Sequence, residues 1–245
     1  MSTHPADAAT AAGFRVARVR AFLTIVAVLS VCSGSEDVAV AAEPAETLVL
    51  RFSGSDWPAW QNATSMPWHP KVRYAPEAGP YGETVVRADS RAAASMLTRK
   101  VQLDPSQTPW VTWTWKVEGP IAKADEQIRR TDDMPARIYF FWNLRRKEDL
   151  ARAEAVAYVW GNALPAGAVR PAPDSSRTAI HVLRSGAEQA GTWQRETRKL
   201  DADYRAFFHK QPTGTVTAVA LLTDTDQTKG MATAWYGPIA ARPVR

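Results

Sequence analysis

Short apolar runs separated by Pro, Gly and Asp recur along most of the chain. The clearest run is WVTWTWKV, residues 110–117, in which Val or Trp at positions 111, 113, 115 and 117 alternates with Thr or Lys between them. Alternation with a period of two predicts a half-buried β-strand, here with Trp113 and Trp115 facing the core. Similar runs predict nine more strands, at residues 47–53, 83–90, 95–103, 137–143, 155–161, 178–185, 192–200, 215–223 and 231–240.

Helical patterns are few in comparison with strand patterns. DADYRAFFHK, residues 201–210, predicts one short helix with Asp201 as its N-cap. Many strands without alternating long helices are typical of two packed β layers. We therefore predict an all-β fold, a single jelly-roll-like β-sandwich of about ten strands with one short helix. No Gly- or Ser-rich linker divides residues 43–245, so we expect one domain there.

The N-terminus has the pattern of an export signal. A basic flank precedes AFLTIVAVLSV, residues 21–31, an apolar run too short to span a bilayer. Small residues follow, which predicts cleavage after Ala42, a signal peptide over residues 1–42 and a periplasmic or secreted product. Cys32 would carry a lipid in the alternative reading, but Val31 stands where a small residue is expected before such a cysteine.

Charge excludes some partner classes. The net charge is +5, yet the bases are scattered and form no readable stripe, so nucleic-acid binding is not expected. This balance supports only a mild attraction to acidic polymers. We expect a monomer without a transmembrane segment in the mature chain. Because Cys32 is the only cysteine, the mature fold depends on no disulfide.

Two aspartates and a threonine, Asp224, Asp226 and Thr228, follow an apolar run directly. Residues two apart on an extended backbone point the same way, so both carboxylates could address one cation or one substrate. The same residues also suit a polar turn that bonds its own backbone. The EF-hand pattern fails, because Lys229 stands where its glycine belongs. The sequence predicts no metal and no other cofactor.

A second acidic segment, with Asp132 and Asp133, precedes Arg137 at the start of an apolar strand. A guanidinium at such a border needs an acidic partner, so an Arg–Asp pair is expected. The alternative is that one aspartate acts as acid or base, since glycoside hydrolysis uses paired carboxylates. We predict that this segment lies close to Asp224 and Asp226 at one end of the sandwich. The catalytic residues, if any, are unknown.

Aromatic residues are numerous and often share a strand face. Most are expected in the core, but exposed rings could stack on sugar rings. The candidates for such a ligand surface are Tyr158, Trp160, Trp235 and Tyr236.

The segments WTWKV, DDMPAR, YVWG, DYRAFF and TDTDQT, in this order, resemble a family of exported bacterial proteins catalogued only as a domain of unknown function. The resemblance covers roughly residues 47–241 and implies a secreted or periplasmic single β domain without an established activity. The function expected from all these patterns is a glycan or envelope-polymer binding or accessory module. Two alternatives stay open: a glycan-active hydrolase or lyase that uses paired aspartates, and a structural envelope protein.

Overall fold

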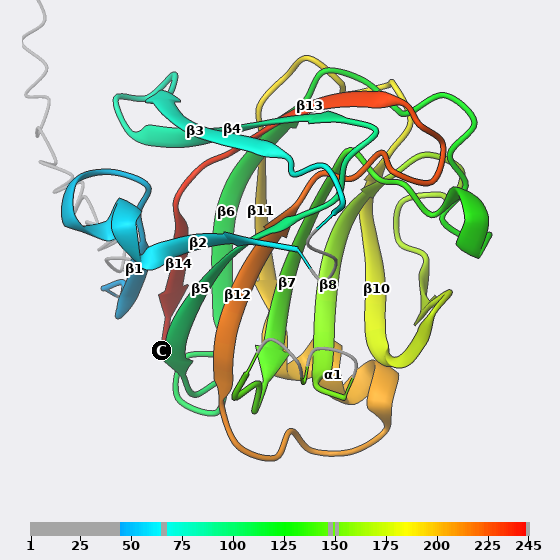
Figure 1. Cartoon of the computed structure of the whole chain (residues 1–245). Helices are drawn as coiled ribbons and strands as arrows, with labels where there is room; N and C mark the ends of the chain where they lie inside the picture. The colour runs from blue at the N-terminus through cyan, green and yellow to red at the C-terminus, as the bar shows by residue number, and fades with distance from the viewer. Residues whose placement is uncertain (1–44, 65–67, 147–148, 150–151, 244–245) are drawn as a thin grey trace, which may run out of the picture. The chain divides into compact units, whose positions relative to one another are not determined.

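The computed structural model describes residues 45–64, 68–146, 149 and 152–243 (Figure 1). The described residues belong to one compact unit, Ala42–Arg245. The predicted signal segment, residues 1–42, lies outside the described residues and stays a prediction. Within the described part of the chain, no helix is long and apolar enough to cross a membrane.

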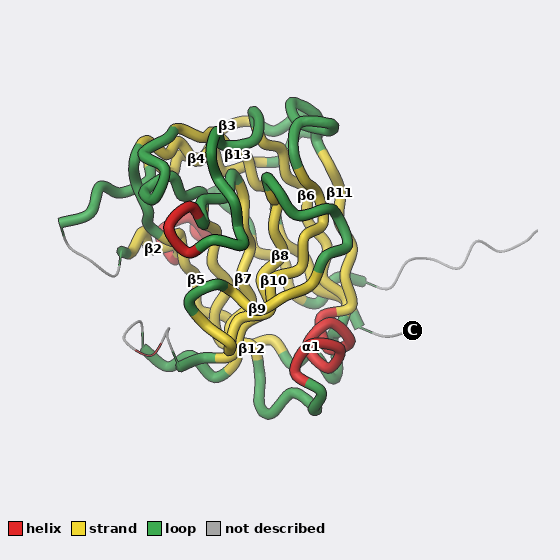
Figure 2. The backbone as a smooth tube through the Cα atoms, turned by 90° about the vertical axis from the view of Figure 1, so that its right-hand side faces the viewer, coloured by secondary structure: helices red, strands yellow, loops and turns green. Residues whose placement is uncertain are grey.

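Two seven-stranded sheets, which we name sheet A and sheet B, pack face to face and confirm the all-β sandwich (Figures 1 and 2). Sheet A contains β1 (Leu48–Leu50), β3 (Arg73–Ala78), β4 (Thr84–Arg91), β6 (Trp110–Val117), β11 (Gln194–Lys199), β13 (Met231–Tyr236) and β14 (Ile239–Arg242). Sheet B has the order β2 (Trp60–Ala63), β5 (Met96–Leu103), β12 (Val216–Leu222), β7 (Ala136–Trp142), β8 (Glu154–Gly161), β10 (Ser175–Ser185) and β9 (Val169–Ala172). Helix α1 (Leu200–Phe208) closes one end, and two 3₁₀ turns are η1 (Gly54–Ala59) and η2 (Arg129–Thr131).

All ten predicted strands and the helix are present, and the described residues add four strands. The predicted N-cap of the helix is wrong, because α1 begins at Leu200 with Lys199 as its N-cap and Asp201 lies in its first turn. Three of these, β2, β3 and β9, lie at sheet edges, and Pro76 and Pro171 interrupt two of them. Proline is tolerated at an edge because its missing N–H needs no partner there. Edge strands also need no strong apolar pattern, which is why the sequence did not reveal them.

The fourth additional strand arises because the predicted run 231–240 divides into β13 and β14. Strand β6 pairs with β11 along one edge, and with β13 and then β14 along the other. Between the two, Gly237 donates its N–H to the Thr114 carbonyl at 2.8 Å. A Cβ at Gly237 would lie 2.1 Å from Thr114 Oγ1, so this close approach requires glycine.

Large aromatic side chains fill the space between the sheets. Trp113 and Trp115 are almost fully buried, as their alternation predicted, and their rings meet edge to face at 5.7 Å. Trp115 also contacts Trp160 of sheet B, with ring centroids 6.0 Å apart. The indole N–H of Trp115 donates to Glu196 Oε1 at 3.0 Å, which satisfies a polar group in the core.

The outer face of sheet B is also buried. Tyr139 and Phe141 stack there with their ring planes 9° apart, between alanines of β12 and β8. Leu144, Leu164 and other partly buried apolar residues pack against this second cluster. The apolar residues on the outer face of sheet B therefore form a second core layer. The outer face of sheet A is more polar and faces solvent.

Candidate functional site

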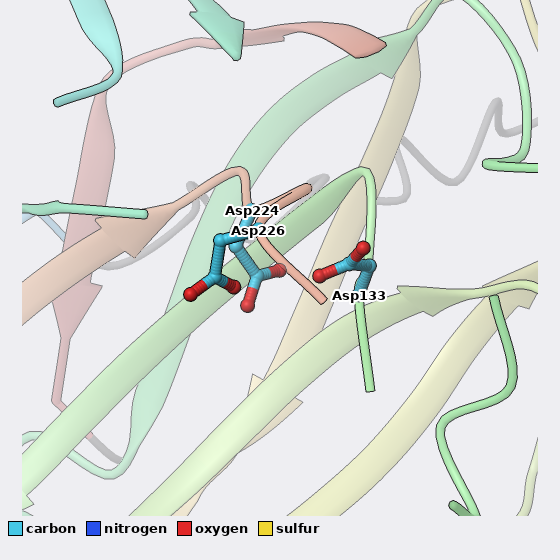
Figure 3. A group of neighbouring side chains, drawn as sticks. All are labelled: Asp133, Asp224 and Asp226. Atoms are coloured by element: carbon cyan, nitrogen blue, oxygen red, sulfur yellow. The ribbon is translucent and has the colours of Figure 1, made fainter. Parts of the chain in front are cut away.

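The two acidic segments predicted from sequence meet at one end of the sandwich. One segment precedes β7 and the other follows β12, and Figure 3 shows the carboxylates of Asp133, Asp224 and Asp226 gathered there. One oxygen of each lies within 4.8 Å of the others. All six predicted polar residues belong to this group, which we call the polar cluster: Asp132, Asp133, Arg137, Asp224, Asp226 and Thr228.

Arg137 organises one half of the polar cluster. Its Nη2 donates to both oxygens of Asp224 at 3.2 Å and also to the Asp132 carbonyl. The Asp132 carboxylate lies 3.5 Å from the same nitrogen, and Nη1 donates to the Tyr139 hydroxyl at 3.2 Å. Arg137 is 4% exposed and Asp224 5%, so this ion pair is buried. The predicted pairing of Arg137 with Asp132 is present, but Asp224 is the more fully bonded partner.

Asp133 organises the other half. Its fully buried carboxylate accepts hydrogen bonds from the backbone N–H groups of Gln227 and Thr228, at 3.1 and 2.7 Å. The Thr228 hydroxyl donates to the same carboxylate at 2.5 Å. The loop after β12 is therefore a structured turn held by a carboxylate from a distant segment. Asp226 lies beside His69, with Oδ2 and Nδ1 3.5 Å apart.

The long charged connection before β7 is fixed by a further buried carboxylate. Glu126 is fully buried and accepts from the backbone N–H groups of Asn162, Ala163 and Leu164. The Asn162 side chain in turn donates to the Asp133 carbonyl at 2.8 Å. These bonds join the connection to the end of β8 and so place Asp132 and Asp133 at the polar cluster.

Electrostatics favour a proton on the polar cluster. Burial, helped by the neighbouring Asp133 and Asp132, raises the pKa of Asp224 to about 7 against the opposing charge of Arg137. Burial also raises the pKa of Asp132. For Arg137, burial disfavours the charge, but Asp132 and Asp224 outweigh it and raise its pKa well above the usual value. One guanidinium cannot neutralise all the surrounding carboxylates, so one of them holds a proton readily.

The chemistry of the polar cluster is that of an internal network. Its carboxylates are ligands of the type that calcium prefers, but Asp133 and Asp224 already accept hydrogen bonds from the chain. Their burial also keeps these two carboxylates from facing a groove as an acid/base pair. Asp133 and Asp224 therefore connect the two loops of the chain.

The predicted aromatic ligand surface is wrong for three of its four residues. Tyr158, Trp160 and Tyr236 are fully buried, because each points inward from its strand into the space between the sheets. Their polar atoms bond inside the protein: the Tyr158 hydroxyl donates to Asp203 at 2.7 Å, and the Trp160 indole to the Gly186 carbonyl at 3.1 Å. Trp235 alone of the four is partly exposed, on the outer face of sheet A.

Trp235 belongs to a row of alternating cationic and aromatic side chains across sheet A. Arg87, Trp235 and Lys116 are direct cross-strand neighbours on β4, β13 and β6. Lys116 Nζ lies 3.9 Å from the Trp235 ring centroid and 5.4 Å from that of Trp193, which precedes β11. The Arg87 guanidinium lies 5.6 Å from the Trp235 centroid. We call this set the tryptophan row: Arg87, Trp235, Lys116 and Trp193.

A shallow depression of about 260 Å³ adjoins the tryptophan row. Tyr81 and Trp193 line it together with Thr114, Gln194 and Arg195. Tyr81 lies in the turn between β3 and β4 and is 74% exposed. We call this feature the Tyr81–Trp193 depression; it combines exposed rings with amide, hydroxyl and guanidinium groups.

The sequence of the chain matches one protein family. The model of the family described as "Protein of unknown function (DUF3047)" matches residues 58–240. The chain belongs to this family. The resemblance expected from the ordered motifs is thereby confirmed, and membership of DUF3047 assigns no activity.

Comparison of this DUF3047 chain with curated proteins finds no match. Among solved structures, it is similar to the CBM22-1 xylan-binding domain of Paenibacillus barcinonensis Xyn10C, with 11% identity, a TM-score of 0.40, and coverage of 84% of this chain and 98% of that domain. It is also similar to the K1 cleaved adhesin domain of Lys-gingipain from Porphyromonas gingivalis W83, with 14% identity, a TM-score of 0.39, and coverage of 81% and 98%. The xyloglucanase domain of NopAA from Sinorhizobium fredii gives 11% identity, a TM-score of 0.42, and coverage of 76% and 93%. These scores are too low to indicate what the DUF3047 chain binds.

Sequence reasoning missed most of the surface that the DUF3047 chain exposes on sheet A. The alternation in residues 110–117 did assign Thr114 and Lys116 to the face opposite the core. The neighbours of that face were not identified: Trp193 lies at the start of the predicted strand 192–200 and Tyr81 lies between two predicted strands, and the positions of both depend on which strands pair. The isolated position of Trp193 directly before a polar strand was the one available signal.

Proposed function

We propose that this protein is an exported glycan-binding module that uses the outer face of sheet A. The observation that carries the proposal is the Tyr81–Trp193 depression beside the tryptophan row. The outer face of sheet B is closed by its own apolar layer, which leaves sheet A as the sandwich face with exposed aromatic rings.

The side chains of the depression match the chemistry of a sugar. A pyranose has apolar C–H faces that stack on flat aromatic rings, and hydroxyl groups around its rim that need hydrogen-bond partners. Tyr81 and Trp193 supply the rings, while Gln194 and Arg195 supply an amide and a guanidinium at the same place. The volume of about 260 Å³ is slightly below the usual range for small-molecule sites, which suits one or two sugar units on an open surface.

A purely structural role explains only part of this surface. Lys116 between Trp235 and Trp193 is a cation–π arrangement, and such contacts stabilise exposed sheet faces by about 0.5–1 kcal/mol each. Tyr81 is different, because its ring makes no aromatic or cation–π contact with any described residue. A large exposed ring without a packing role is more readily explained by a ligand.

Binding to a glycan array followed by titration with the best ligand tests the proposal. We expect Tyr81→Ala and Trp193→Ala to lower the affinity about five-fold or more, since stacking on a ring is worth about 1 kcal/mol or more. Tyr81→Ala should leave the melting temperature unchanged, because the ring is exposed.

Trp68→Ala is the matched control. Trp68 is 79% exposed and does not line the depression, so its removal should leave glycan affinity unchanged. An array without any retained glycan, or a ligand whose affinity survives both depression variants, would contradict the proposal.

A further inference from the structure

We propose that a second depression, beside the end of β7 and the start of β8, binds an oxyanion group: a carboxylate, a sulfate or a phosphate. This anion-binding depression has a volume of about 290 Å³. Its lining includes Trp142, Glu154 and four cationic side chains, Arg145, Arg152, Arg177 and Lys210. None of these residues belongs to the polar cluster or to the Tyr81–Trp193 depression, so the inference does not depend on the proposed glycan surface.

The depression holds more positive than negative charge. Lys210 Nζ lies 2.7 Å from Glu154 Oε1, and Arg177 Nη2 lies 3.5 Å from the same oxygen. The other oxygen, Oε2, accepts a hydrogen bond from the Tyr204 hydroxyl. Two cations therefore share one carboxylate oxygen, which leaves one positive charge without a counterion.

The remaining lining residues do not cancel this excess. Arg145 and Arg152 add two further guanidinium groups, and neither forms an ion pair with any residue that the structure describes. Asp149 is the second carboxylate of the lining, and it lies 3.5 Å from Arg146. A depression lined by such an excess of positive charge attracts an anion.

The donors are held in place before any ligand arrives. Arg177 Nε donates to the Arg152 carbonyl at 2.7 Å, which fixes the plane of its guanidinium. A fixed guanidinium can bind a carboxylate or phosphate through two parallel hydrogen bonds. Partial burial disfavours the charge of Glu154, but hydrogen bonds from Lys210 and Tyr204 outweigh this and lower its pKa. Glu154 thus stays ionised and keeps Lys210 and Arg177 at the depression.

Isothermal titration calorimetry of the purified protein with sulfate, phosphate and glucuronate, at constant ionic strength, tests the inference. We expect saturable binding of at least one of the three, and the three arms identify the favoured oxyanion. Arg177→Gln and Lys210→Gln should each weaken this binding about ten-fold or more, because a charge-assisted hydrogen bond is lost. Circular dichroism verifies that each variant is folded.

Arg73→Gln is the matched control, because it removes one exposed positive charge on the edge strand β3, and Arg73 does not line the depression. It should bind the anion like the parent protein. Equal weakening in Arg73→Gln and Arg177→Gln would show a general charge effect and overturn the inference, as would no saturable binding. Tyr81→Ala should leave anion binding unchanged, so failure here is distinguishable from failure of the glycan proposal.

Discussion

Removal of the Arg137 guanidinium should destabilise the fold strongly, in a pH-dependent way. Arg137→Met keeps most of the side-chain volume but leaves Asp224, 5% exposed, without the one cation that pairs with it among the described residues. Breaking a buried ion pair from one side costs about 3–5 kcal/mol. For a domain of this size, 1 kcal/mol corresponds to about 2–4 °C in melting temperature, so we expect a decrease of about 6–20 °C at pH 8.

Acid should reduce this cost. The pKa of Asp224 is about 7 with Arg137 present, so the carboxyl of the variant is protonated at pH 5.5 and needs no counterion. Thermal melts and urea denaturation at pH 8 and pH 5.5 measure both effects. Arg99→Met is the control, because Arg99 forms a similar 2.8 Å pair with Asp56 at a more exposed place, where we expect about 1 kcal/mol or less. A loss in Arg137→Met no larger than in the control, or equal at both pH values, would refute the reasoning.

Three further predictions concern single residues or the chain terminus. Asp224 has a folded pKa of about 7, above its unfolded value near 3.9, so the stability that its proton contributes is present at low pH and is lost as the pH rises from about 4 to 7. The melting temperature of the parent protein minus that of Asp224→Asn should therefore decrease as the pH rises across that window. A constant difference would contradict the assignment. Trp113→Ala should cost about 3–5 kcal/mol in urea denaturation because the ring is 2% exposed, whereas Trp68→Ala should stay within about 0.5 kcal/mol. Mass spectrometry of the exported protein should find a chain that starts near Glu43, and a lipid on Cys32 would contradict it.

Strand burial was predictable where the pattern is local. The alternation in residues 110–117 identified the buried tryptophans of β6, since a period of two depends only on the pleat of one strand. The same reasoning failed for Tyr158 and Trp160. Their strand, β8, is buried on both faces, and the nearly continuous apolar run AVAYVWG already indicated that no side of it faces water.

Proximity of the two acidic segments was predictable, but their pairing was not. Each segment lies at a border between polar residues and a strongly apolar strand, and such borders collect at the ends of a sandwich. Which carboxylate bonds which donor depends on side-chain directions in three dimensions. The carboxylate of Asp133 accepts a hydrogen bond from Thr228, whereas Arg137 forms its buried ion pair with Asp224. The exposed surface was the least predictable part, because Tyr81 and Trp193 come from turns more than a hundred residues apart.

The position of β6 has a consequence for how the chain can fold. Among the described strands, one edge of this tryptophan-rich strand is covered only by β13 and β14, which follow it by more than a hundred residues. Until those residues have been synthesised, β6 has an open edge that favours aggregation with other chains. Pairing across more than a hundred residues is also slow, because a long loop must close first. Sheet A therefore cannot be completed before β13 and β14 have been synthesised. A truncation before β13 is expected to give insoluble protein rather than a smaller folded domain.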